Sequence, residues 1–183
     1  RGDITPAYST LTAESVARVR QRLGAVKILF VLRDPLERAW SMACMDLLRN
    51  RDQTLDSVSE EELIQHVTSE KSISRSSYIE SYQRWAACFG AHNVLVCYYD
   101  ELCEDSRLFT GKVLSFLGTD TAAMDWEAAA FETRENESGF PMPEAIEAVL
   151  RELYGRDLCA LTDFFRSRAT RCWCDRWLGH ATR

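Results

Sequence analysis

The stretch that most constrains the fold runs from Lys27 to Met45, with the sequence KILFVLRDPLERAWSMACM. Its apolar run, Ile28–Leu32, is too short for a typical helix and suits a parallel strand that is buried on both faces. Asp34 then offers a helix cap, Pro35 fits the first helical position, and the glutamate three residues after the aspartate completes an Asp-x-x-Glu capping box. The sequence therefore predicts a central strand that stops at Arg33 and a helix that follows at once.

Such a junction is where open α/β sheets bind ligands, because a helix N-terminus presents N–H groups and a positive dipole to an anion. Arg33 stands at this place, and its guanidinium can donate to two phosphate oxygens at once. An apolar stripe at helical spacing predicts how the helix packs: Leu36, Trp40, Ala43 and Leu47. Ser41 lies off the centre of that stripe. We predict that Arg33 and Ser41 hold one anion, and the alternative is an ordinary turn with Arg33 in a surface ion pair.

Length and composition indicate one folded domain. A chain of 183 residues, 46% of them hydrophobic, can bury a sizeable core. The formal net charge of −6 argues against a general nucleic-acid surface, although it leaves room for a local anion pocket. No apolar run approaches the roughly 20 residues that cross a bilayer, so we expect no membrane span.

The seven cysteines are odd in number and lie mostly in apolar or helical stretches. They are therefore predicted to be small buried side chains of a protein in a reducing compartment, and we expect a cytoplasmic location. Cys172 and Cys174 with His180 suggest a metal site as an alternative. The Cys-x-Cys spacing is unusual for structural zinc and a fourth ligand is not apparent, so we predict no metal.

Residues 33–41, RDPLERAWS, resemble the 3′-phosphate-binding motif of sulfotransferases that use 3′-phosphoadenosine 5′-phosphosulfate (PAPS), particularly the bacterial and glycan-sulfating branch. In that family an arginine at the strand end and a serine eight positions later hold the 3′-phosphate, and Arg33 and Ser41 have this separation. The resemblance implies an α/β fold of the P-loop-NTPase-like sulfotransferase type, a parallel sheet flanked by helices, in a single domain over residues 1–183. It also implies PAPS as co-substrate, no metal, and a small-molecule or glycan hydroxyl as acceptor.

The N-terminal segment is similar to the Gly-(Asp/Glu)-x-(Thr/Ser)-Pro-x-Tyr segment of the same family, which lines the acceptor side of the active site. The resemblance assigns Thr5 and Tyr8 to acceptor binding. Some relatives have a sulfonate-binding lysine where this chain has Ile4. A plain loop is the alternative for this segment.

Two further residues are assigned to the nucleotide by resemblance. Tyr78 begins a predicted helix whose aromatic stripe precedes a second buried strand at 93–99, and in the family a tyrosine early in this helix reaches the nucleotide. A core aromatic is an almost equal alternative. The loop at 131–143 returns to the nucleotide in the family, which makes Arg134 the candidate for a second phosphate contact. A solvated loop is the favoured interpretation there.

The remaining pattern predicts covering helices from the positions of caps and glycine stops. The expected helices are 12–23, 58–69, 105–118, 143–154 and 157–165, with a last helix packed through Trp173 and Trp177.

Two parts of a sulfotransferase active site have no counterpart in the sequence. Nothing matches the lysine-containing loop that cradles the 5′-phosphosulfate, and no catalytic base is assigned, so the domain is expected to be N-terminally incomplete. Because the chain begins with Arg1 and not Met, it stays open whether residues precede it. Two hypotheses follow: a PAPS-dependent sulfotransferase, or a non-catalytic module of that fold that binds a nucleotide or a protein. The acceptor's identity and the oligomeric state are not predicted.

Overall fold

The computed structural model describes residues 2–120, 126 and 139–179, and these residues pack as two compact units. Unit 1 comprises the described residues within 1–9, 34–78 and 136–183, and unit 2 those within 10–33 and 79–135. The backbone thus passes from unit 2 to unit 1 between Arg33 and Asp34. The single domain expected from the sequence stays a prediction.

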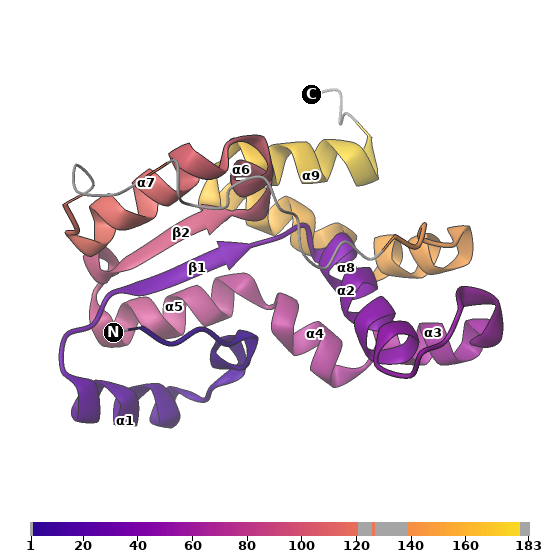
Figure 1. Cartoon of the computed structure of the whole chain (residues 1–183), viewed down its shortest axis with the longest axis horizontal. Helices are drawn as coiled ribbons and strands as arrows, with labels where there is room; N and C mark the ends of the chain where they lie inside the picture. Colours follow the sequence, from indigo (N-terminus) through magenta and orange to yellow (C-terminus); the bar gives the residue numbers. More distant parts are fainter. Residues whose placement is uncertain (1, 121–125, 127–138, 180–183) are drawn as a thin grey trace. The chain divides into compact units, whose positions relative to one another are not determined.

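Unit 2 is built on a parallel pair of strands (Figure 1). Its elements are α1 (Ala13–Leu23), β1 (Ile28–Leu32), α5 (Tyr78–Phe89, whose first residue belongs to unit 1), the 3₁₀ helix η4 (Ala91–Asn93), β2 (Val94–Tyr98), α6 (Tyr99–Glu104) and α7 (Ser106–Leu117). The strands pair in register from Ile28 opposite Val94 to Leu32 opposite Tyr98. Both predicted strands are confirmed, and so is their parallel direction, but among the described residues β1 pairs with β2 alone and is not the expected central strand.

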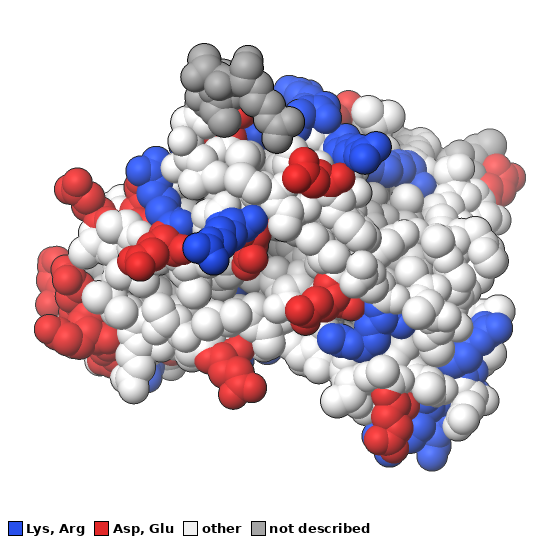
Figure 2. All heavy atoms as spheres, turned by 180° about the vertical axis from the view of Figure 1, so that it is seen from behind, with Lys and Arg blue, Asp and Glu red and all other residues white. Residues whose placement is uncertain are grey.

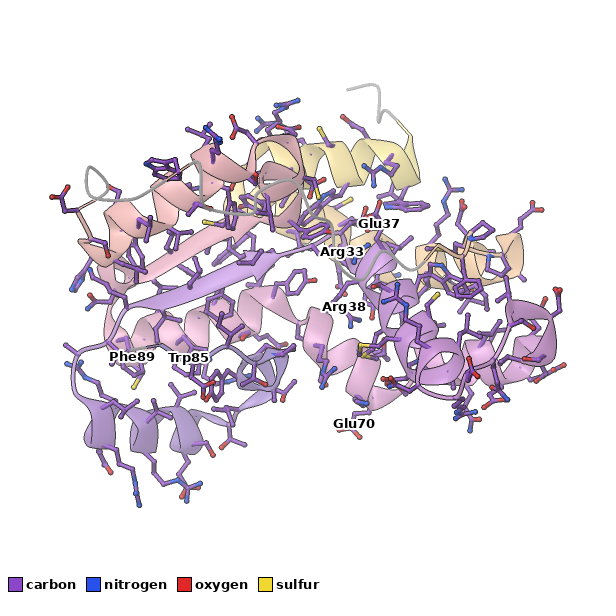
Figure 3. The ribbon with its side chains drawn as sticks, viewed as in Figure 1. Arg33, Glu37, Arg38, Glu70, Trp85 and Phe89 are labelled. Atoms are coloured by element: carbon purple, nitrogen blue, oxygen red, sulfur yellow. The ribbon has the colours of Figure 1, made fainter. Side chains whose placement is uncertain are left out.

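The two faces of β1 differ in burial. Ile28 and Phe30 pack against a cluster of Val16 from α1 with Trp85 and Phe89 from α5, so α1 and α5 cover this face (Figure 3). The alternate residues Leu29 and Val31 are 40% and 45% exposed. The prediction of burial on both faces is therefore wrong for β1. A run of apolar residues shows that both faces can be buried, and only the packed neighbours decide whether they are.

Unit 1 is helical (Figure 1). Its elements are the 3₁₀ helix η1 (Pro6–Thr10, whose last residue belongs to unit 2), α2 (Pro35–Ala43), the π-helix η2 (Cys44–Arg49), the 3₁₀ helix η3 (Leu55–Ser57), α3 (Glu60–Val67), α4 (Glu70–Ser76), α8 (Glu144–Phe165) and α9 (Arg168–Leu178). The predicted apolar stripe is confirmed, because all four of its side chains are buried, three on α2 and Leu47 on η2. The fully buried α8 residues Ile146, Leu150 and Leu158 extend this core.

Most helix ends lie where local sequence predicts them. Thr12 accepts a hydrogen bond from the backbone N–H of Ser15 at the start of α1, and Asp105 caps α7 in the same way. Gly24 and Gly118, with φ of 69° and 76°, stop the same two helices. Glycine is suited to these positions because a side chain strains a backbone with positive φ.

The C-terminal region differs from its prediction, because one helix of 22 residues, α8, replaces the two expected at 143–154 and 157–165. Gly155 lies in its interior, between the two ranges predicted. A β-carbon at this position would lie 3.4 Å from Cδ2 of Leu178 on α9. The small residue therefore sits where α9 packs closely, and packing keeps the helix continuous despite the low helix propensity of glycine.

We expect Gly155→Ala to stabilise unit 1 by about 0.5–1 kcal/mol, because alanine is the better helix former and its methyl group meets Leu178 at an ordinary contact distance. Urea unfolding curves of the variant and the parent measure this difference. Gly118→Ala is the matched control, and it should destabilise because its φ is positive. A loss of stability in Gly155→Ala would show that α8 does not tolerate a side chain there.

The cysteine prediction is correct in part. Cys44 and Cys97 are buried, whereas Cys159 and Cys172 are exposed. Among the described residues, no helix has both the length and the hydropathy needed to cross a membrane.

Candidate functional site

Arg33 is the first residue after β1, at the carboxyl end of the sheet (Figure 3). Its Cζ lies 4.9 Å from the ring centroid of Tyr99, the first residue after β2. Both residues belong to unit 2, and the parallel register that pairs Leu32 with Tyr98 brings them together. The ring supports the planar guanidinium by a cation–π contact, so the side chain is half-buried and positioned before any ligand binds.

The start of α2 is formed by a buried carboxylate. Asp34 is 1% exposed and its Oδ1 accepts from the backbone N–H of Leu36 at 2.9 Å and of Glu37 at 3.4 Å. Pro35, the first helical residue, has no N–H. The predicted cap is confirmed. The expectation that this helix end presents open N–H groups to an anion is wrong for the first turn, so side chains must provide the contacts there.

Glu37 does not complete the predicted capping box. Its carboxylate accepts a hydrogen bond from Arg176 of α9, and Figure 3 shows it at the start of α2. The same guanidinium lies 3.5 Å from Oδ2 of Asp34, and the indole N–H of Trp177 donates to that oxygen. Helix α9 therefore holds both the N-cap Asp34 and the first-turn Glu37 of α2, and the local motif does not encode this contact.

The pKa of the Asp34 carboxyl is raised from 3.8 to about 6, and burial is the largest cause of this rise. The negative charge of Glu37 raises the pKa further, whereas hydrogen bonds from Trp177, Leu36 and the backbone of Glu37 lower it. Among the described residues of unit 1, the charged neighbours of this carboxylate are Arg176 and Glu37. The cost of burying the charge exceeds the gain from its hydrogen bonds.

This pKa predicts a stability effect with a definite sign. Because the folded carboxyl binds its proton more tightly than the unfolded one, the protonated group stabilises the fold below about pH 4, and this contribution is lost as the pH rises through about 6. Asp34→Asn keeps a good cap and does not titrate. We expect the unfolding free energy of the parent, relative to this variant, to fall by roughly 2 kcal/mol between pH 4 and pH 7.

Urea unfolding of both proteins at several pH values measures this difference, and the subtraction removes the contribution of other carboxyl groups. A difference that stays flat, or that grows with pH, would contradict the raised pKa.

Ser41 lies in the second turn of α2 and is half-buried. Within the described residues its hydroxyl makes no hydrogen bond. The buried neighbours Trp40 and Met42 hold the helix in place, and the indole N–H of Trp40 donates to the carbonyl of Phe140 at 3.0 Å. Arg33 and Ser41 belong to different units. Their joint contact to one anion stays a prediction.

A second arginine of the motif has a structural role. Arg38 donates from Nε to Oγ of Ser76 at 2.7 Å and from Nη2 to the carbonyl of Ser72 at 2.8 Å. In Figure 3 its side chain extends from α2 toward α4. Both serines are buried, so the guanidinium satisfies polar groups that would otherwise be costly inside unit 1.

The acceptor segment is exposed. The Thr5 hydroxyl accepts from the N–H of Ala7 at 3.3 Å, and the hydroxyl of Tyr8 donates to Asp3. This hydrogen bond raises the pKa of Tyr8. Ile4, at the position of the family's lysine, is 97% exposed. These contacts give the segment a local structure, and the assignment of Thr5 and Tyr8 to acceptor binding stays a prediction.

Of the two other nucleotide candidates, the structure describes Tyr78 but not Arg134. Tyr78 is 6% exposed at the start of α5, a burial that agrees with a core aromatic as well as with a nucleotide contact that uses its edge. Arg134 lies outside the described residues. Both assignments stay predictions.

Sequence reasoning missed three residues that contact the motif. Tyr99 could have been found, because it follows the strand parallel to β1 by one residue, as Arg33 follows β1 itself. The sequence predicts that Trp177 packs the last helix, but it gives no signal for the partner of Trp177 or for Arg176, since both lie more than 140 positions from Asp34 along the chain.

The surface charge is uneven. Figure 2 shows acidic side chains gathered over the end of unit 1 that carries α3, whose first turn contains Glu60, Glu61 and Glu62. This face does not suit a polyanion. In the described part of the chain, no three metal-ligating side chains lie together.

The chain is similar to known proteins in both sequence and fold. Residues 15–153 match the family described as the sulfotransferase domain. A search of curated proteins gave no match. Among solved structures, a sulfotransferase from Alicyclobacillus acidocaldarius is similar, with a TM-score of 0.63 and 21% sequence identity over 91% of this chain. The match spans 64% of that protein's chain, and at this identity it shows a shared fold.

Proposed function

Because the chain belongs to the sulfotransferase domain family, we propose that it serves in the transfer of a sulfonate group from PAPS to an acceptor hydroxyl. The family match and the shared fold support the general class. The donor, the acceptor and activity itself belong to the proposal.

One observation carries the proposal furthest, namely the placement of Arg33. A cation at the carboxyl end of a parallel strand lies at the sheet edge where α/β proteins bind ligands, and a guanidinium suits phosphate oxygens. Tyr99 supports the guanidinium. Asp34, the nearest acid in the sequence, has its carboxylate buried and hydrogen-bonded within unit 1. The Asp34 carboxylate thus has hydrogen-bond partners within unit 1.

In the proposed reaction a base deprotonates the acceptor hydroxyl, the oxygen attacks sulfur in line, and 3′-phosphoadenosine 5′-phosphate leaves. This chain's part is recognition of the nucleotide. Arg33 forms charge-assisted hydrogen bonds to the 3′-phosphate, and Ser41 donates a further one from its hydroxyl. The eight-residue separation of these two residues supports this pairing. No base is assigned among residues 1–183.

Three other residues complete the proposed roles. Tyr78 packs beside the nucleotide, and Thr5 and Tyr8 border a small-molecule or glycan acceptor. The exposed position of the N-terminal segment agrees with a part in binding the acceptor.

A thermal-shift titration tests the proposal. The full chain is titrated with 3′-phosphoadenosine 5′-phosphate and, as the matched control, with adenosine 5′-monophosphate, which lacks only the 3′-phosphate. A ligand at a hundred times its dissociation constant stabilises the folded state by about 2.7 kcal/mol, so a specific site shifts the midpoint clearly. We expect a shift with the first nucleotide and little or none with the second at equal concentration.

Equal shifts would show that the 3′-phosphate is not recognised and would contradict the assignment of Arg33. No shift with either nucleotide would favour the second hypothesis, a non-catalytic module that uses this fold for protein contacts.

A further inference from the structure

Two thiols of unit 1 face each other across a helix pair. Cys159 of α8 and Cys174 of α9 have their Sγ atoms 4.0 Å apart. The two helices lie side by side in Figure 1, and Trp173, which is fully buried, fixes their packing. A disulfide needs an S–S distance of about 2.05 Å, so the two sulfurs have to approach by roughly 2 Å.

The pair is also accessible to a reagent. Cys159 is exposed and Cys174 is partly exposed, whereas Cys44 and Cys97 are buried. Burial and the neighbouring Cys159 thiol raise the pKa of Cys174. The more exposed Cys159 is therefore the thiol that reacts first with an external oxidant, and Cys174 is placed to react second.

The location of the pair links it to the start of α2. Cys174 precedes Arg176 and Trp177 by two and three residues on α9, and these two side chains hold Asp34 and Glu37. A bond at Cys174 would fix α9 against α8 close to the residues that support the first turn of α2.

We propose that Cys159 and Cys174 form a reversible disulfide that fastens α9 to α8 and thereby steadies the contact of α9 with Asp34. The inference concerns unit 1 alone and does not depend on the proposed function.

The oxidant is a low-molecular-weight disulfide such as oxidised glutathione. The Cys159 thiolate attacks one of its sulfurs, the glutathione S–S bond breaks, and one glutathione leaves as a thiolate. Cys174 then loses its proton, its sulfur attacks the Cys159 sulfur of the mixed disulfide, and the second glutathione leaves. Two protein thiols are thus oxidised, and one oxidised glutathione is reduced to two thiols.

Peptide mapping tests the bond. The full chain is equilibrated in glutathione buffers of increasing oxidised fraction, free thiols are alkylated, and the unreduced protein is digested with trypsin. We expect the peptide 157–166 to be linked to the peptide 172–176, which contains both Cys172 and Cys174. Cys172→Ser is the matched control and should keep the link, whereas Cys174→Ser should lose it. Absence of the link under oxidising conditions, or its survival in Cys174→Ser, would overturn the proposal.

Hydrogen exchange tests the consequence. We expect amide exchange in α9 to slow at least tenfold on oxidation, with slower exchange also in the first turn of α2. The Cys159→Ser variant should show neither change. Equal exchange in the oxidised and reduced forms would refute the effect on α9 and Asp34.

Discussion

Arg33→Ala is expected to weaken the binding of 3′-phosphoadenosine 5′-phosphate by about a hundredfold, or roughly 2–3 kcal/mol, because it removes a charge-assisted contact to the 3′-phosphate. The half-buried guanidinium rests on the ring of Tyr99, so little side-chain ordering is needed when the ligand binds. Isothermal titration calorimetry on the parent and the variant measures the effect.

The specificity of this loss is tested with adenosine 5′-monophosphate in a double cycle of variant and ligand. If Arg33 contacts the 3′-phosphate, the substitution should change the affinity for this shorter nucleotide little. Arg33→Lys should lie between the parent and Arg33→Ala, because lysine keeps the charge without the two-pronged geometry. An equal loss for both nucleotides, or no loss at all, would contradict the assigned role.

The second large effect concerns stability. Trp173 is fully buried where α9 packs on α8, so Trp173→Ala leaves a large cavity and should lower the unfolding free energy of unit 1 by about 3–5 kcal/mol. Urea unfolding followed by far-ultraviolet circular dichroism measures the change.

Leu178→Ala on the same helix is the matched control. Leu178 is 44% exposed, so its truncation should cost about 1 kcal/mol or less. Similar losses in the two variants would show that α9 is not held by the buried indole.

Much of the site's framework could be predicted from short-range sequence. The strand before Arg33, the cap at Asp34 and the buried stripe of α2 all follow from interactions within about ten residues. Such features depend on steric and hydrogen-bonding preferences that act locally, so they can be inferred without knowing the fold.

Three predictions failed because the outcome depended on segments that are distant in the sequence. Glu37 bonds Arg176 instead of closing the capping box, since α9 brings a guanidinium to the start of α2. Gly155 stays helical because α9 packs against it. Leu29 and Val31 are exposed because the apolar pattern of a strand does not show what covers each face.

By itself, the sequence determined the strand-to-helix junction at Arg33, the caps and stops of most helices, and the resemblance to sulfotransferases that the family match confirms. Only the tertiary structure decided that Tyr99 supports Arg33, that α9 holds the buried carboxylate of Asp34, and that Cys159 faces Cys174. The physical reason is that capping and amphipathic patterns act over a few residues. Contacts between distant segments depend on how whole elements pack.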